Sequence, residues 1–322
     1  MVLANIMNAS IESFKLDCTN ILAAIEPGMS IKLSEWIMYR DSVLEIITSS
    51  GHSKQLSDIQ ELRMAFGKAY DNQIADLADY MICLERMKEN IDNVLSLLVP
   101  QKVKHLIMDE YIKRLSDYHK KNFDKYRLDK IEGVIEIRKC ILSWLPLGLY
   151  DYQISGIPKR NLLLCPTNQK LSFLCYIAKH MRGFSPVYEV HLPKQTGKHL
   201  TPESVYESYE LLTQVLKMNP SVKGIFSSAW YHDPVVAEIN PHLKYLNELF
   251  LNNGGYIHKL GSTESCKQDA LLKSKTRQQL YAEGKYMPTN YGRYWSRDAM
   301  IMWAKSMKAD SRQSTGSEKH AL

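Results

Sequence analysis

The spacing of apolar residues changes near residue 145, and this change is the strongest constraint on the fold. Before it, apolar side chains recur every three or four residues over long stretches, as on the buried faces of amphipathic helices. After it, short apolar runs alternate with helical patterns, and Pro and Gly separate them. The sequence therefore predicts a helical N-terminal half, residues 1–145, and a small C-terminal half of the α/β or α+β class, residues 161–308.

Helical patterns cover most of the first half. Three of them extend over 59–98, 103–123 and 131–142, and Pro100 separates the first from the second. This half has no Gly-rich loop and no clustered metal ligands. We therefore interpret it as a scaffold or cap, through which a protein partner could also dock.

Turn-forming residues, including Pro146 and Gly148, are concentrated in residues 146–160. We interpret this stretch as the connection between the halves. The polar segment 309–322 at the end of the sequence is expected to be disordered.

Strands and helices alternate in the second half. Apolar runs at 161–165, 187–192 and 222–228 predict strands, and the patterns at 167–181 and 202–218 predict the helices between them. Strand, helix and strand in this order form a βαβ unit, so we expect the first two strands to pair in parallel.

Composition excludes several classes of protein. The 322 residues include 41 Lys and Arg against 35 Asp and Glu, and the net charge of +6 forms no dense basic stripe, which argues against nucleic acid as a partner. None of the six cysteines lies in a C-x-x-C pair, so we expect no zinc site built from cysteines. The sequence contains neither the ~20 consecutive apolar residues of a membrane span nor a basic and apolar leader. We therefore expect a cytoplasmic protein.

Glu189 and His191 are the first candidates for catalysis. Alternate residues of a strand share a face, so the carboxylate and the imidazole would lie side by side. A carboxylate can orient an imidazole and raise its basicity, as a general base requires. The alternative is a structural hydrogen bond on a solvated strand face.

A second candidate site follows the strand predicted at 222–228. Ligands of open α/β sheets bind at the carboxyl ends of strands, and polar and aromatic side chains are concentrated here. Asp233 before Pro234 also suits the start of a helix, which is the structural alternative for that residue. The candidate side chains are Ser227, Ser228, Trp230, Tyr231, His232 and Asp233.

Cations mixed with aromatic residues form a third group, in which Arg277, Tyr291, Arg293 and Arg297 could grip an acidic ligand. The same residues could instead form a surface loop that its own aromatic side chains pack. Binding of nucleic acid would require one continuous face that carries Lys273, Lys275, Arg277, Arg293 and Arg297.

The remaining histidines give no metal site. His199 and His242 have no partner in the sequence, and we expect them at the surface. A metal held by His191, His199 and His232 is not supported by any ligand spacing such as H-E-x-x-H, so we expect none.

The segment 187–234 resembles part of the GNAT-like acyltransferase superfamily, in its diverged bacterial members with an added helical portion. In that pattern a strand ends in a His-containing dipeptide, a Pro-led helix and another strand follow, and a Ser-x-Trp-x-x-Asp-Pro turn ends the unit. The whole back half, about half of the chain, is also similar to a group of uncharacterised bacterial proteins. The matching parts here are Val190-His191-Leu192-Pro193, Thr201-Pro202-Glu203-Ser204 and the segment from Ser228 to Pro234.

The resemblance implies transfer of an acyl group to an amine or hydroxyl of a small metabolite. Acyl-coenzyme A or an acylated carrier would be the donor. The usual coenzyme A loop of such enzymes, a basic residue and a Gly-x-Gly or Gly-x-Ala turn into a helix, is not evident. Residues 194–198, Lys-Gln-Thr-Gly-Lys, contain one glycine and two lysines instead.

On this hypothesis His191, or alternatively His232, takes the proton of the acceptor, and Glu189 orients His191. Ser228 and Trp230 shape the pocket. One of the three arginines Arg277, Arg293 and Arg297 holds an acidic group. The alternative from another class is a non-catalytic ligand-binding or protein-interaction protein with a helical docking half.

Overall fold

The computed structural model describes residues 2–29, 31–49, 52–193 and 200–317. The chain forms two compact units, and the main division falls after residue 145, where the apolar spacing changes. The first unit comprises Met1–Leu97 and Gln101–Leu145, and the second comprises Leu98–Pro100 and Pro146–Leu322.

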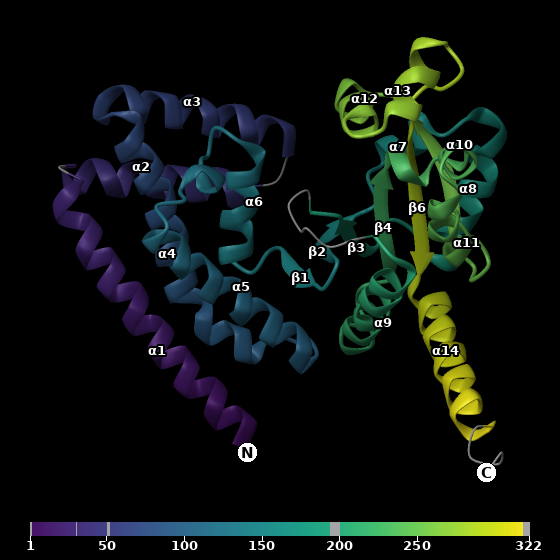
Figure 1. The fold of residues 1–322 in the computed structure, drawn as a ribbon, viewed down its shortest axis with the longest axis horizontal. Coiled ribbons are helices and arrows are strands. Elements are labelled where there is room, and N and C mark those ends of the chain that lie inside the picture. Colours follow the sequence, from purple (N-terminus) through teal and green to yellow (C-terminus); the bar gives the residue numbers. More distant parts are fainter. Residues whose placement is uncertain (1, 30, 50–51, 194–199, 318–322) are drawn as a thin grey trace. The chain divides into compact units, whose positions relative to one another are not determined.

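The first unit is helical, as predicted (Figure 1). Its described residues before position 140 contain no strand. Two short 3₁₀ turns, η1 (Glu26–Gly28) and η2 (Asp124–Tyr126), interrupt the α-helices. The helices are α1 (Val2–Ile25), α2 (Leu33–Thr48), α3 (His52–Tyr70), α4 (Asn72–Ser96), α5 (Gln101–His119) and α6 (Ile131–Cys140).

The apolar pattern over 59–98 is divided between two helices. Asp71 has a φ of 96°, which ends α3, and its carboxylate accepts a hydrogen bond from the Gln73 backbone to cap α4. In α4 the buried Asp79 accepts hydrogen bonds from Tyr39 of α2 and Arg63 of α3. These bonds fix three helices around one carboxylate.

A six-stranded mixed sheet forms the core of the second unit, in the order β1-β2-β3-β4-β6-β5. β3 and β4 are parallel, whereas the pairs β2–β3, β4–β6 and β5–β6 are antiparallel. The strands are β1 (Leu145–Leu147), β2 (Tyr150–Gly156), β3 (Pro186–His191), β4 (Gly224–Ala229), β5 (Tyr256–Gly261) and β6 (Asn290–Ser296).

Helices pack on both faces of this sheet. Successive large side chains of β6 point to opposite faces, and the helices bury them on both. Tyr294 lies in a core with Phe173 of α8, and the next residue, Trp295, packs on the other face against Tyr209 of α9 and Trp303 of α14. The helices are α7 (Arg160–Leu164), α8 (Thr167–His180), α9 (Pro202–Met218), α10 (Pro234–Ile239), α11 (Tyr245–Leu251), α12 (Glu264–Leu271), α13 (Lys275–Ala282) and α14 (Arg297–Ser317).

The strand predicted at 161–165 is wrong, because these residues form the short helix α7. Leu163 is 78% exposed and Leu164 is also exposed, so the apolar run is not a buried strand. Asn161 and Cys165 are buried, and the Asn161 side chain donates a hydrogen bond to the Tyr294 hydroxyl over 2.8 Å. A run of five residues is too short for its periodicity to distinguish a helix from a strand.

Residues 146–160 contain most of β1 and all of β2, where we expected a connection. Tyr150 and Tyr152 are buried in β2, and the strand pairs with β3 in antiparallel register. The expected parallel pair of 161–165 with 187–192 is therefore wrong. The parallel pair is β3 with β4, joined by α9. At the other end of the chain, α14 continues to Ser317, where we expected disorder from 309 onward.

Candidate functional site

β3 and β4 separate after a short parallel contact, and this opens the sheet. Their register contains two pairs, Tyr188 with Ile225 and Glu189 with Phe226. Both strands then continue, β3 to His191 and β4 to Ala229, with no further pairing between these described residues. The carboxyl ends of the two parallel strands therefore diverge, which is where open α/β sheets bind ligands.

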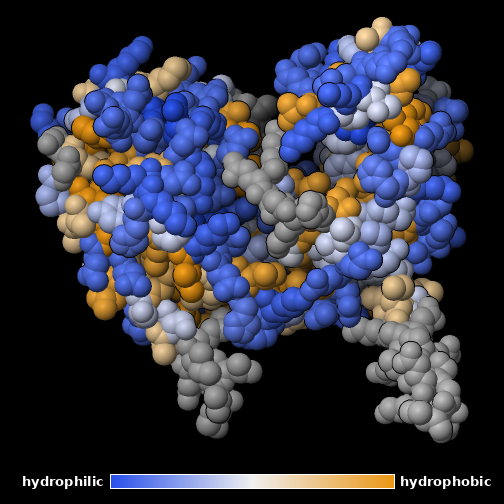
Figure 2. Space-filling view, in the orientation of Figure 1, coloured by the Kyte–Doolittle hydropathy of each residue, from blue (hydrophilic) through white to orange (hydrophobic). Residues whose placement is uncertain are grey.

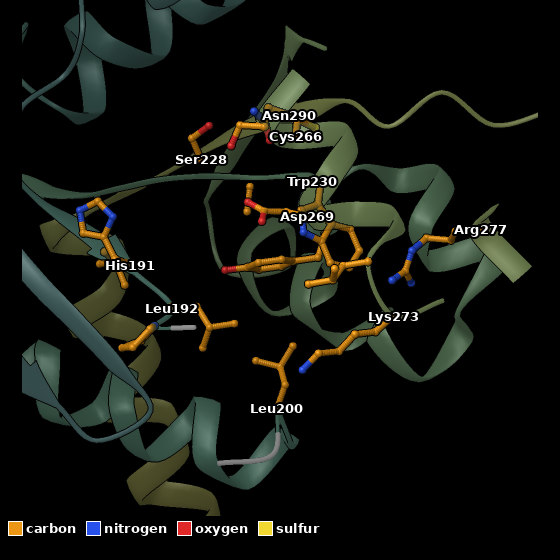
Figure 3. A pocket seen from close by; sticks show the side chains of 16 residues that line it. His191, Leu192, Leu200, Ser228, Trp230, Cys266, Asp269, Lys273, Arg277 and Asn290 are labelled. Carbon is orange, nitrogen blue, oxygen red and sulfur yellow. The ribbon is translucent and has the colours of Figure 1, made fainter. Parts of the chain in front are cut away.

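A cavity of about 770 Å³ lies at this opening (Figure 3), a volume suited to a small molecule. The ends of β3 and β4 line it together with η3 (Trp230–His232) and the segments around α12 and α13. The lining residues are Val190, His191, Leu192, Pro193, Leu200, Ser228, Ala229, Trp230, Tyr231, Ser265, Cys266, Asp269, Leu272, Lys273, Arg277 and Asn290.

His191 lies at the end of β3 with two polar groups beside it. Its Nε2 is 3.8 Å from Oε1 of Glu189, two residues earlier on the same strand face. The side-chain amide of Gln153 is 3.3 Å from this nitrogen and 3.3 Å from Oε2 of Glu189. His191 retains a side-chain exposure of 29%, and it lines the cavity, whereas Glu189 lies behind it. This arrangement can hold an imidazole in place and stabilise its protonated form.

Gln153 was not among the predicted site residues. It lies on β2 directly opposite Glu189. No sequence pattern pointed to Gln153, because turn-forming residues around β2 favoured a connection over a strand.

His232 does not line the cavity, although the sequence offered it as an alternative base. Its ring is fully buried, and its Nδ1 lies 3.2 Å from the Tyr291 carbonyl. Burial, and then the charge of Arg293, lower the pKa of His232 well below its ordinary value, so the ring is neutral. The Asn247 side chain donates a hydrogen bond to the His232 carbonyl over 3.0 Å. These contacts hold η3 in place.

The segment from Ser227 to Asp233 is divided between the cavity and the interior. Ser228, Trp230 and Tyr231 line the cavity together with His191. Ser227 is buried within β4, and Asp233 caps α10 through a 3.0 Å hydrogen bond from the Val235 backbone. Asp233 thus has the structural role that the sequence offered as its alternative.

Arg277 alone of the three predicted arginines lines the cavity. Arg293 is buried against α11, where it donates to the Leu246 carbonyl over 2.6 Å. Arg297 lies at the amino end of α14 and lines a different cavity of about 230 Å³. Tyr291 contributes its carbonyl to His232 and does not line the main cavity. Because Arg277 and Arg293 are buried, the continuous basic face that nucleic acid would require does not form.

Several lining residues were not predicted as site residues, among them Cys266, Asp269 and Asn290. Burial raises the pKa of the Cys266 thiol, so this residue is not an activated nucleophile.

Residues 194–199, which include the lysines considered for a coenzyme A loop and His199, lie outside the described part of the chain. His242 is exposed, in agreement with its prediction.

Within the described ranges, no group of three or more His, Cys, Asp or Glu side chains could hold a metal ion. No helix within those ranges is long and apolar enough to cross a membrane.

A scan against protein-family models gave no match, and neither did a comparison with curated protein sequences. Among solved structures, the chain is distantly similar to an acyltransferase in complex with decanoyl-CoA, with 14% identity and a TM-score of 0.39 over 68% of this chain and 64% of that chain.

A complex of an acyltransferase with decanoyl-CoA and teicoplanin gives 10% identity and a TM-score of 0.42, over 69% of this chain and 67% of that chain. An acyltransferase mutant in complex with octanoyl-CoA gives 9% identity and a TM-score of 0.41, over 86% of this chain and 98% of that chain. At these scores the likeness establishes neither a shared fold nor a shared activity.

Proposed function

We propose that this protein is an acyltransferase-like enzyme that transfers an acyl group to an amine or hydroxyl of a small metabolite. The observation that carries the proposal is the imidazole of His191 at the opening between β3 and β4, supported from behind by Glu189 and Gln153. A positioned base beside a cavity for a small molecule is what such a transfer requires. The resemblance of segment 187–234 to GNAT-like acyltransferases supports the same reaction.

In the proposed reaction the acceptor gives its proton to His191. The lone pair of the acceptor nitrogen or oxygen then attacks the acyl carbonyl carbon, and the bond from that carbon to the sulfur of the donor breaks. The thiolate that leaves takes the proton from the His191 imidazolium, which restores the neutral base. Glu189 stabilises the imidazolium that forms, and Gln153 holds the carboxylate and the ring in position beside each other.

A thioester of coenzyme A or of an acylated carrier is the donor in this proposal. Ser228 and Trp230 shape the cavity in which the acyl group or the acceptor lies. All six cysteines are free thiols, which supports a reducing compartment, and we infer that the protein acts in the cytoplasm.

The proposal is tested by searching for the ligand and then for transfer. Mass spectrometry of small molecules that co-purify with the protein identifies candidate donors and acceptors. Acyl-coenzyme A of several chain lengths is then incubated with these acceptors, and both the free thiol and the acylated product are measured. Stoichiometric appearance of both supports the proposal. Stable binding of a ligand in the cavity without any acyl transfer would overturn it, in favour of a non-catalytic binding protein.

A further inference from the structure

One end of the cavity is positively charged. Arg277 and Lys273 line it, and Figure 3 shows them on the side away from His191. Arg277 lies in α13, and Lys273 lies in the turn between α12 and α13. The acidic residue of the described lining is Asp269, so two cations face one carboxylate in this cavity.

Arg277 is held rigidly by neutral groups. Its Nε donates to the Ala270 carbonyl over 2.6 Å, and its Nη1 donates to the Asn240 side-chain oxygen over 2.8 Å. The guanidinium carbon lies 4.4 Å from the centre of the Trp230 ring, so the indole packs against the cation. These contacts occupy two of the three guanidinium nitrogens.

The charge of Arg277 lacks a carboxylate partner among the described residues, although its exposure is 7%. A buried cation without a counter-charge is unfavourable, because removal from water is not offset by a nearby anion. Burial lowers the pKa of Arg277 for this reason. An anion in the cavity would provide the missing charge.

Lys273 is the second cation, and it is exposed. It forms no ion pair or hydrogen bond with the described part of the chain, so its ammonium group can move to meet a ligand. A fixed guanidinium and an adaptable ammonium can bind an oxyanion from two sides.

We propose that this end of the cavity binds an anionic group of a substrate, a carboxylate or a phosphate, while the reacting group lies at His191. This inference rests on the proposed acyl transfer and adds the chemical class of the substrate. The anion can belong to the acceptor or to the phosphates of a coenzyme A donor. In both cases Trp230 fixes the orientation of Arg277 that the anion meets.

Anion binding is measured by calorimetry, with glutarate as a dicarboxylate and inorganic phosphate as the two probes. Arg277→Met keeps the length of the side chain and removes its charge, and we expect binding to weaken by roughly 10- to 100-fold, the range for loss of a charged hydrogen bond. Lys273→Met should weaken binding by a smaller factor, and because this residue is exposed, the variant should fold normally.

Lys275→Met is the matched control. Lys275 is exposed at the start of the same helix but does not line the cavity, so its removal should leave binding unchanged. If no probe binds saturably, or if Lys273→Met and Lys275→Met behave alike, the inference is wrong.

The source of the anion is identified by comparing the binding of coenzyme A with that of pantetheine, which lacks the phosphates. If the Lys273 and Arg277 variants bind coenzyme A more weakly but bind pantetheine as before, the site holds the phosphates of the donor. Unchanged coenzyme A binding with weaker glutarate binding assigns it to the acceptor.

His191→Ala distinguishes this inference from the proposed reaction, because it should lower the turnover of transfer by about 10²–10⁴-fold and leave anion binding intact. Transfer that proceeds equally with acidic acceptors and their neutral amides, and with coenzyme A and pantetheine thioesters, would refute the anion site and leave the reaction standing. Anion binding that depends on Arg277, in a protein that shows no acyl transfer, would support the anion site and refute the reaction.

Discussion

His191 combines access to the cavity with support from the strand behind it. The ring is partly exposed, whereas the Glu189 carboxylate and the Gln153 amide lie beside it in the sheet. His232 has the opposite character, because it is buried, neutral and bonded to the backbone. The two histidines that the sequence offered as bases therefore differ in what they can do.

We expect His191→Ala to lower the turnover of acyl transfer by about 10²–10⁴-fold, the usual contribution of a positioned acid–base group. The fold should persist, because the ring faces a cavity and its removal leaves no void in the core. The pH–rate profile should also lose its low-pH limb, which reports protonation of the base. Unchanged turnover with an identified substrate would remove His191 from the mechanism.

Glu189→Gln should have a smaller effect, roughly tenfold or less, because the ring stays in place and only the charge that stabilises the imidazolium is lost. The midpoint of the low-pH limb should move to lower pH, since the neutral ring is then favoured. A purely structural role for Glu189 would lower activity without moving this midpoint.

His232 should make stability depend on pH. The folded state keeps the ring neutral because burial and Arg293 lower its pKa, whereas the unfolded chain binds a proton below about pH 6.5. Stability is therefore present above that pH and falls on acidification, by up to about 1.4 kcal/mol per pH unit. Urea unfolding at several pH values should show a smaller decline in His232→Gln. Equal declines in both proteins would contradict this assignment.

At the scale of elements, the switch from helices to a mixed sheet could be predicted from the sequence, but the pairing of the strands could not. β3 and β4 were located because each has a clear apolar run followed by polar residues. β2 was missed because Gly148, which precedes it, and Gly156, its last residue, both indicated turns. The run at 161–165 was assigned to a strand because burial cannot be inferred from five residues.

Most of the candidate site that could be predicted lies at the ends of strands. His191 and Ser228 lie at the ends of β3 and β4, Trp230 and Tyr231 directly follow β4, and the structure brings them to one cavity. Strand pairing places Gln153 opposite Glu189, and Asp269 and Asn290 reach the cavity from distant segments. Local sequence therefore carries no signal for these three residues.

The start of β4 requires a glycine at position 224. A Cβ there would lie 2.3 Å from the Trp295 carbonyl oxygen of β6, and φ is +156°. Gly224→Ala should therefore destabilise the second unit by about 1–3 kcal/mol. Gly156→Ala is the control, because nothing lies within 4 Å of its Cβ, and it should change stability by less than about 0.5 kcal/mol. Equal unfolding midpoints for the two variants would contradict this account.

At the scale of the whole molecule, the chain does not divide into two sequential blocks. Leu98–Pro100 belongs to the second unit, although α5 and α6, which follow it, belong to the first. The chain therefore leaves the first unit, returns to it, and leaves again at residue 145. The second unit consequently cannot be reduced to residues 146–322 without loss of one of its segments.

Truncations should separate the parts of α14 and β6 that the second unit needs. A chain ending at residue 308 keeps Met300, Trp303 and Ala304, which are buried, and should retain a folded sheet. A chain ending at residue 289 lacks β6, the strand between β4 and β5, and should lose protection of β4 amides from hydrogen exchange. Protected β4 amides in the shorter chain would show that β6 is dispensable.

The position of β6 also sets the order of events during translation. Among the described strands of this sheet it is synthesised after the other five, yet it fills an interior place between β4 and β5. Until residues 290–296 leave the ribosome, one edge of β4 is open and β5 has no partner. The helical unit can complete its fold much earlier, so the nascent protein passes through a stage with one finished unit and one unfinished sheet. That stage is when aggregation and chaperone binding are most favoured.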